Sequence, residues 1–305
     1  MKREVAAGSS IAVVSAFVWS TYYIFLHMLG KVSFFSIFLY PSLAGGILFV
    51  LYSLMTEGSV RLPSKKRDIL IPALGYLASQ FMIILSTEVN GGVITATFVL
   101  VGDAIISPSI IYLIGRNRFV PNLSLFFPGV VLLVVSSAIL SLFGGQFGVH
   151  SLYGLMLIVT VPFLIALFFV YTNERIMVDG MARILMPTFF VSSLLVFFPF
   201  LITSSRVVLA LPDFADVLIL IVTGATSMFA GYYLFFAASR LTGFTLTSIL
   251  MCMIPVFTLL LSAALIGVRL TTASLALIIA AVLGAALCTI AFSEGKKRDR
   301  SQSSE

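Results

Sequence analysis

The most prominent pattern in the sequence is a series of long apolar runs separated by short polar segments. A helix of about 20 apolar residues crosses the ~30 Å hydrocarbon core of a bilayer. Helix is the required form because backbone groups in lipid must be hydrogen-bonded within the segment. The runs predict ten transmembrane helices, near residues 8–28, 34–56, 69–88, 91–115, 124–143, 153–174, 184–204, 215–237, 245–267 and 271–292. We therefore expect an all-α integral membrane protein.

Composition supports a lipid environment. Of the 305 residues, 60% are hydrophobic and 10% are charged, whereas soluble domains carry about 25% charged residues. The net charge of +6 does not indicate a nucleic-acid partner, because the basic residues fall in short segments between apolar runs. Cys252 and Cys288 both lie within apolar runs, where cysteine behaves as a small hydrophobic residue. We expect no disulfide and no cofactor.

The distribution of Lys and Arg predicts the orientation, since cytoplasmic loops carry the excess of basic residues. If the N-terminus is cytoplasmic, 15 of the 18 basic residues lie inside and 3 lie outside, namely Lys31, Arg206 and Arg269. We therefore expect a multi-pass protein of the cell membrane with both termini in the cytoplasm. Residues 294–305 are polar and charged, and we expect them to form a disordered cytoplasmic tail.

The ten runs divide into two sets of five, residues 1–147 and 148–293. Shifting the fourth run onto the ninth pairs Gly91 with Gly243 and brings further identical residues into register. Because five is an odd number, a duplicated half inserts upside down relative to the first. Two inverted repeats around a central site can rock and expose that site to each side in turn. This architecture favours a transporter of a small molecule.

Asp103 is the most unusual residue within the apolar runs. It lies twelve residues from each end of the fourth run, near the middle of the membrane, where an ionised carboxylate is costly unless it faces a polar cavity. One interpretation is that Asp103 binds an ammonium group of the substrate or a coupling proton. The other is a protonated Asp that hydrogen-bonds a neighbouring helix.

Several uncommon side chains are further candidates for substrate binding. Trp19, Tyr22 and Tyr23 share one helical face, and they form either an aromatic wall of a solute cavity or a packing surface. Gln80 and Tyr232 are related by the same offset as the fourth and ninth runs. They either contact solute near the repeat axis or form an interhelical hydrogen bond.

Two stretches resemble the drug/metabolite transporter superfamily, in its ten-helix EamA-type branch. Val18-Trp19-Ser20-Thr21 resembles the first helix of that family, and Ala237 to Leu241, Ser248 to Leu250 and Ile254-Pro255-Val256 resemble its eighth and ninth helices. The resemblance implies export of amino acids or related metabolites by alternating access, without a cofactor.

The chain departs from the family pattern at two places. The family often has a Glu just after the Gly that ends the fourth and ninth helices, and here Arg116 and Val268 stand there. No role of that Glu can be carried over. Pro255 of the ninth run is matched by Asp103 in the fourth.

Other functions stay open as alternatives. An uncoupled facilitator or an uptake carrier of another metabolite would have the same sequence features. An intramembrane aspartyl protease would need two membrane-embedded Asp residues, and only Asp103 qualifies. His27 and His150 have no partner at ligand spacing, so we expect no metal site. The expected partners are a small-molecule substrate, the lipid bilayer and a coupling proton.

Overall fold

The computed structural model of the chain describes residues 2–29, 32–90, 106, 121–143, 152–203, 212–267 and 269–302, and these ranges contain helices and no strand. The helices are α1 (Lys2–Met28), α2 (Phe34–Glu57), α3 (Arg67–Asn90), α5 (Leu123–Phe143), α6 (Leu152–Asp179), α7 (Met181–Thr203), α8 (Phe214–Thr223), the π-helix η1 (Gly224–Gly231), α9 (Tyr232–Thr242), α10 (Phe244–Leu250), the 3-10 turn η2 (Met251–Met253), α11 (Ile254–Ile266) and α12 (Thr272–Gln302).

Nine of the predicted spans overlap described helices, two of them (215–237 and 245–267) as consecutive helical segments, and the predicted span 91–115 lies outside the described residues except for Ile106. Within the described ranges, seven helical stretches are long and apolar enough to cross a membrane. Two shorter apolar stretches, Leu123–Ser136 and Met181–Phe197, accompany them. The structure is therefore that of a multi-pass helical membrane protein.

The ends of several helices follow from single residues. Ser33 caps α2 by accepting a hydrogen bond from the Ser36 amide at 3.3 Å, and Asp213 caps α8 in the same way at 2.8 Å. Gly243 separates α9 from α10 with φ of 85°, and Gly267 ends α11 with φ of 77°. Glycine is favoured at both positions because a Cβ is strained in this region of backbone space.

The polar segment that follows the last membrane span is helical as far as Gln302. The polar segment 294–305 was expected to be disordered, whereas α12 continues without interruption through the membrane span to Gln302. Lys, Arg, Glu and Gln are good helix formers, so a helix that is already nucleated in the membrane can extend into a polar segment.

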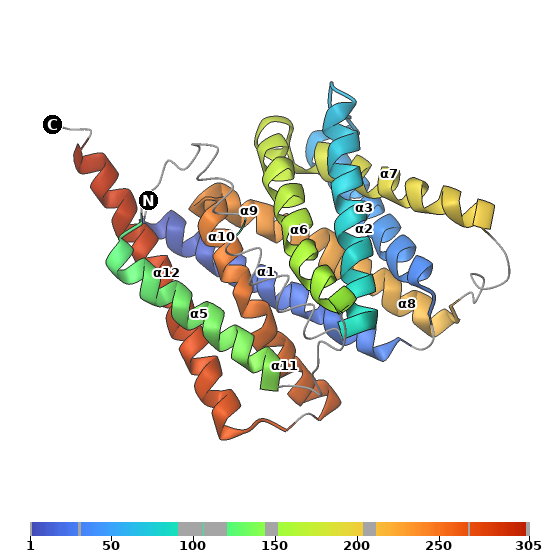
Figure 1. Cartoon of the computed structure of the whole chain (residues 1–305). Coiled ribbons are helices and arrows are strands. Elements are labelled where there is room, and N and C mark those ends of the chain that lie inside the picture. Colours follow the sequence, from blue (N-terminus) through green and yellow to red (C-terminus); the bar gives the residue numbers. More distant parts are fainter. Residues whose placement is uncertain are drawn as a thin grey trace.

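Helices from the two halves of the chain pack against one another in a reciprocal way (Figure 1). The first helix of each half contacts the third span of the other half, since α1 packs on α9 and α6 packs on α3. The two second helices, α2 and α7, contact each other, and so do α5 and α12. The last pair lies along one flank of the molecule, with α11 beside it.

Glycine allows the closest of these contacts. A Cβ on Gly284 of α12 would lie 2.5 Å from the backbone nitrogen of Leu133, and one on Gly129 of α5 would lie 2.9 Å from that of Cys288. The two backbones therefore touch directly, as small residues permit between membrane helices. Cys288 and Cys252 are both buried and carry free thiols.

Candidate functional site

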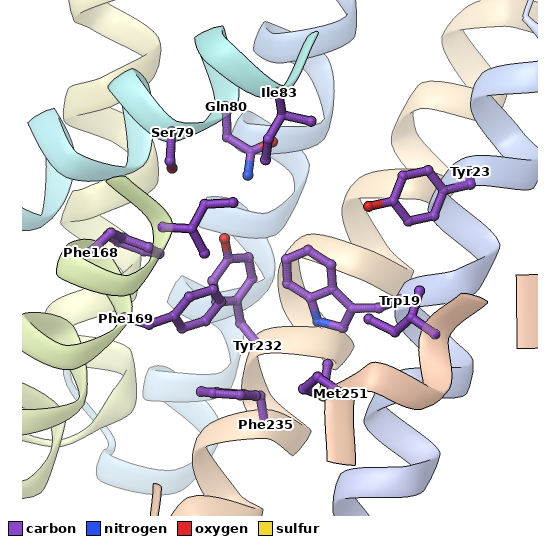
Figure 2. A pocket seen from close by; sticks show the side chains of 12 residues that line it. Trp19, Tyr23, Ser79, Gln80, Ile83, Phe168, Phe169, Tyr232, Phe235 and Met251 are labelled. Carbon is purple, nitrogen blue, oxygen red and sulfur yellow. The ribbon is translucent and has the colours of Figure 1, made fainter. Parts of the chain in front are cut away.

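A cavity lies between the two halves of the chain, among α1 and α3 from the first half and α6, α9, η2 and α11 from the second (Figure 2). Six of its lining residues are aromatic, four are aliphatic or thioether and two are polar. These are Trp19, Tyr23, Phe168, Phe169, Tyr232 and Phe235; Ile83, Ile165, Met251 and Ile254; and Ser79 and Gln80. Its volume is about 40 Å³, which is room for roughly three water molecules.

The rings around the cavity meet at oblique angles. The centroid of Tyr232 lies 4.9 Å from that of Trp19, with 59° between the ring planes. On its other side Tyr232 stacks on Phe169 at 5.7 Å and 20°. Contacts of this kind are favourable for aromatic pairs, so Tyr232 is held between a ring of α1 and a ring of α6.

Trp19 sits directly on a glycine of the π-helix. A Cβ on Gly231 would lie 2.6 Å from Cδ1 of Trp19 and would clash with Nε1. The buried indole N–H has no hydrogen-bond partner among the described residues. Such a group costs free energy when it is buried, and π-helices are often found at functional sites.

Further polar groups of the cavity come from α3 and α9. Gln80 and Ser79 are both buried, and the hydroxyl of Tyr232 points toward the Gln80 amide (Figure 2). Ser79 donates its hydroxyl hydrogen to the Tyr76 carbonyl at 2.9 Å. The Gln80 amide has three hydrogen-bonding positions, so its contact with Tyr232 leaves others that can bind a solute.

The remaining wall contains a break in the ninth span. Pro255 has no amide hydrogen, so the carbonyl of residue 251, four positions earlier, loses its α-helical partner. The chain forms the 3-10 turn Met251–Met253 at this point, and Pro255 lies in the first turn of α11. The break places Met251 at the cavity.

The structure brings together four of the six candidate residues predicted from the sequence. Trp19, Tyr23, Gln80 and Tyr232 line the cavity. Tyr22 is 4% exposed and does not line it, although its ring meets that of Tyr23 edge to face at 5.5 Å. Asp103 lies outside the described residues, and its role stays a prediction.

Charged residues gather away from the cavity, at the end of the bundle where α3 begins and α6 ends. Asp68 is 3% exposed. It accepts a hydrogen bond from the Tyr171 hydroxyl at 3.1 Å and lies 3.5 Å from Nε of Arg175 and 3.7 Å from that of Arg67. The Arg175 guanidinium also lies 5.3 Å from the centre of the Tyr171 ring, so the charge of Asp68 is compensated from two helices.

Further polar contacts join helices at the same end. Ser239 of α9 donates to the Asn173 side chain at 2.8 Å, and Arg240 donates to the carbonyl of Ile176 at 3.0 Å. Arg183 of α7 pairs with Glu57 of α2 at 2.9 Å. We call one set of these residues the α3–α6 latch: Asp68, Tyr171, Arg175, Ser239 and Asn173.

Among the described residues, no group of acidic, His and Cys side chains could hold a metal ion.

Sequence reasoning did not identify the latch or the phenylalanines of the cavity. Asp68 stood in a predicted loop, where an acidic residue is unremarkable. Phe168 and Phe169 stood in an apolar run, where nothing distinguishes a cavity-lining ring from a lipid-facing one.

Comparison with protein families matches residues 152–290 to the EamA-like transporter family. No curated protein matches the chain. A solved crystal structure superposes with a TM-score of 0.76 at 16% sequence identity, over 94% of this chain and 98% of that chain. At this identity the superposition shows a shared fold. The family resemblance inferred from the sequence is confirmed for residues 152–290.

Proposed function

We propose that the protein is a secondary transporter that exports amino acids or related metabolites by alternating access, on the basis that residues 152–290 match the EamA-like transporter family. The family and the apolar helices indicate a multi-pass membrane transporter of small solutes rather than an enzyme. The solute, the direction of transport and the mechanism belong to the proposal.

Reciprocal packing supports the proposed pair of inverted repeats, residues 1–147 and 148–293. A two-fold axis in the membrane plane requires that each contact between the halves have a counterpart. The α1–α9 contact and the α6–α3 contact are such counterparts, and the α2–α7 and α5–α12 pairs join equivalent helices. With a fourth span at 91–115, each repeat would have five helices.

The cavity lies at the contact between these halves, which is where transporters built from repeats bind their substrates. This position is the observation that carries the proposal. Gln80 and Tyr232, at equivalent places of the two repeats, both line it. A rocking motion of one half against the other would change access to these residues.

The α3–α6 latch supports a conformation that is closed at one end. Under the proposed topology, with both termini in the cytoplasm of a cell-membrane protein, this end faces the cytoplasm. Asp68 and Arg175 lie on helices of different halves, so opening a path to the cytoplasm would separate them. Loading of solute from the cytoplasm would then begin with release of the latch.

Transport is tested with purified protein in liposomes. Amino acids and related metabolites are loaded inside, and efflux is measured with and without a pH gradient, against protein-free liposomes. We expect saturable efflux of at least one solute, accelerated by the gradient if a proton is coupled. Absence of flux for every solute, with protein that remains folded by thermal unfolding, would contradict a transport function.

A further inference from the structure

We propose that the cavity binds a flat, uncharged ring of the transported solute and that the Gln80 amide hydrogen-bonds a neutral polar group on that ring. This inference rests on the proposed transport function and adds the chemical class of the part of the solute that the cavity recognises. The rings, the polar groups, the charges and the size of the cavity support it separately.

The shape of the lining favours a planar group. Trp19 and Tyr232 face each other from α1 and α9, and Phe168 and Phe169 approach from α6 with 5.2 Å between their centroids (Figure 2). A planar ring that enters between such side chains gains contacts over both faces and at its edge. Aromatic pairs in these arrangements gain free energy beyond that of their buried area. A saturated chain of equal size does not gain this additional free energy.

The hydrogen-bonding groups favour a neutral amide, carbonyl or ring nitrogen. Gln80 has one acceptor and two donors, and its contact with the Tyr232 hydroxyl leaves the other positions of the amide for a polar group of the solute. The hydroxyl hydrogen of Ser79 is already used by the Tyr76 carbonyl. Gln80 therefore offers more hydrogen-bonding positions to a polar ring than Ser79 does, and a plain hydrocarbon would use none of them.

The charge distribution disfavours an ionised group in this space. None of the twelve lining residues, all of which the structure describes, is acidic or basic. Asp68 and Arg175, the ion pair of the latch, are oppositely charged and lie 3.5 Å apart away from this cavity. An ion buried among apolar side chains without a partner costs several kcal/mol in practice, so a solute must present an uncharged part here.

The size of the cavity indicates that a ring enters only when side chains separate. A volume of about 40 Å³ is smaller than a six-membered ring. Trp19 can move without breaking a side-chain hydrogen bond, because its indole N–H has no partner among the described residues. Binding of a ring would displace Trp19 and change its surroundings.

Trp19 also provides the measurement, since it is the single tryptophan of the chain. Protein in detergent is excited at the indole band and titrated with three matched probes: benzamide, benzoate and cyclohexanecarboxamide. We expect a saturable change in emission with benzamide, and at least tenfold weaker binding of benzoate, which is charged, and of cyclohexanecarboxamide, which is not planar. Trp19→Phe must abolish the signal.

Gln80→Met keeps the approximate size of the side chain and removes the amide. We expect it to weaken benzamide binding by roughly threefold to tenfold, the range for one neutral hydrogen bond. Ser193→Ala is the matched control, because it removes a buried hydroxyl that bonds within α7 and does not line the cavity. Unchanged benzamide affinity in Gln80→Met, or equal affinity for benzamide and benzoate, would overturn the inference.

The outcome is separable from that of the transport assay. Efflux of solutes from liposomes without saturable benzamide binding would leave the transport function standing and refute the ring-binding cavity. Saturable benzamide binding without efflux of any solute would leave the ring-binding cavity standing and contradict the transport function.

Discussion

The indole of Trp19 lies against the Cα of Gly231, with no room for a methyl group between α1 and the π-helix. Gly231→Ala would therefore push the ring toward the cavity. Overpacking of this kind costs about 1–3 kcal/mol, and here it also fills the space between Trp19 and Tyr232. We expect a lower melting temperature, a shifted Trp19 emission spectrum and slower solute flux.

Gly75→Ala is the matched control for that substitution. Gly75 lies on α3, and a Cβ there would be 3.4 Å from the Cβ of Phe168, an ordinary contact. Alanine is also the better helix former by roughly 1 kcal/mol. We expect unchanged or slightly higher stability and unchanged emission. Equal effects of Gly231→Ala and Gly75→Ala on stability and emission would show that the close contact between Trp19 and Gly231 is not needed.

The α3–α6 latch predicts a strong effect of Asp68→Asn. The substitution leaves Arg175 without its charge partner on a helix of the other half. Removing one member of a buried pair costs up to about 3–5 kcal/mol, and since the Arg175 side chain is 26% exposed, solvent reduces this figure. We expect a clear fall in melting temperature and faster maleimide labelling of cysteines introduced at this end.

Glu57→Gln is the comparison for Asp68→Asn. The Glu57–Arg183 pair lies at the same end, but its side chains are 29% and 30% exposed. Exposed pairs contribute at most about 1 kcal/mol, so we expect a small change in melting temperature. If Asp68→Asn were equally mild, the latch would not hold the helices together.

The α5–α12 contact predicts intolerance to larger residues at its centre. Gly284→Leu would force the backbones apart at Leu133, at a cost of several kcal/mol by extrapolation from overpacked cores. Ala286→Leu, on an exposed face of the same helix, should be tolerated. Thermal unfolding in detergent measures both. Similar stability of the two variants would mean that the close approach is not needed.

Tyr76 links three helical segments, because its hydroxyl lies 2.9 Å from Ser42 Oγ of α2 and 3.1 Å from Sδ of Met228 in the π-helix. Tyr76→Phe keeps the ring and removes these contacts. We expect a loss of about 0.6–2 kcal/mol, the range for a hydrogen bond between membrane helices. An unchanged melting temperature would contradict this.

Hydropathy located the described helices because lipid imposes a length and a composition on every span. The aromatic and polar candidates were also visible, since Trp19 and Gln80 are uncommon inside apolar runs. Phe168 could not be recognised in the same way. It is 3% exposed, whereas Phe163 in the same helix is 51% exposed, and the two differ only in what packs against them.

Other features depend on tertiary contacts that leave no local pattern. The burial of Asp68 results from the approach of Tyr171 and Arg175 more than 100 positions later. The π-helix Gly224–Gly231 interrupts an otherwise ordinary apolar run, and no residue in it demands that geometry. The helical extension to Gln302 was missed because polar composition alone does not distinguish a solvated helix from coil.

The π-helix also makes the length of its segment matter. Its i→i+5 hydrogen bonds accommodate about one residue more per turn than an α-helix does. Deleting the extra residue would let Gly224–Gly231 close into a regular α-helix, with Tyr232 and Phe235 still at the cavity. Inserting a further residue that the π-helix does not absorb would turn the following helix by about 100° about its axis and move both rings off the cavity without changing either side chain. The number of residues in this stretch therefore sets the rotation of α9 about its own axis.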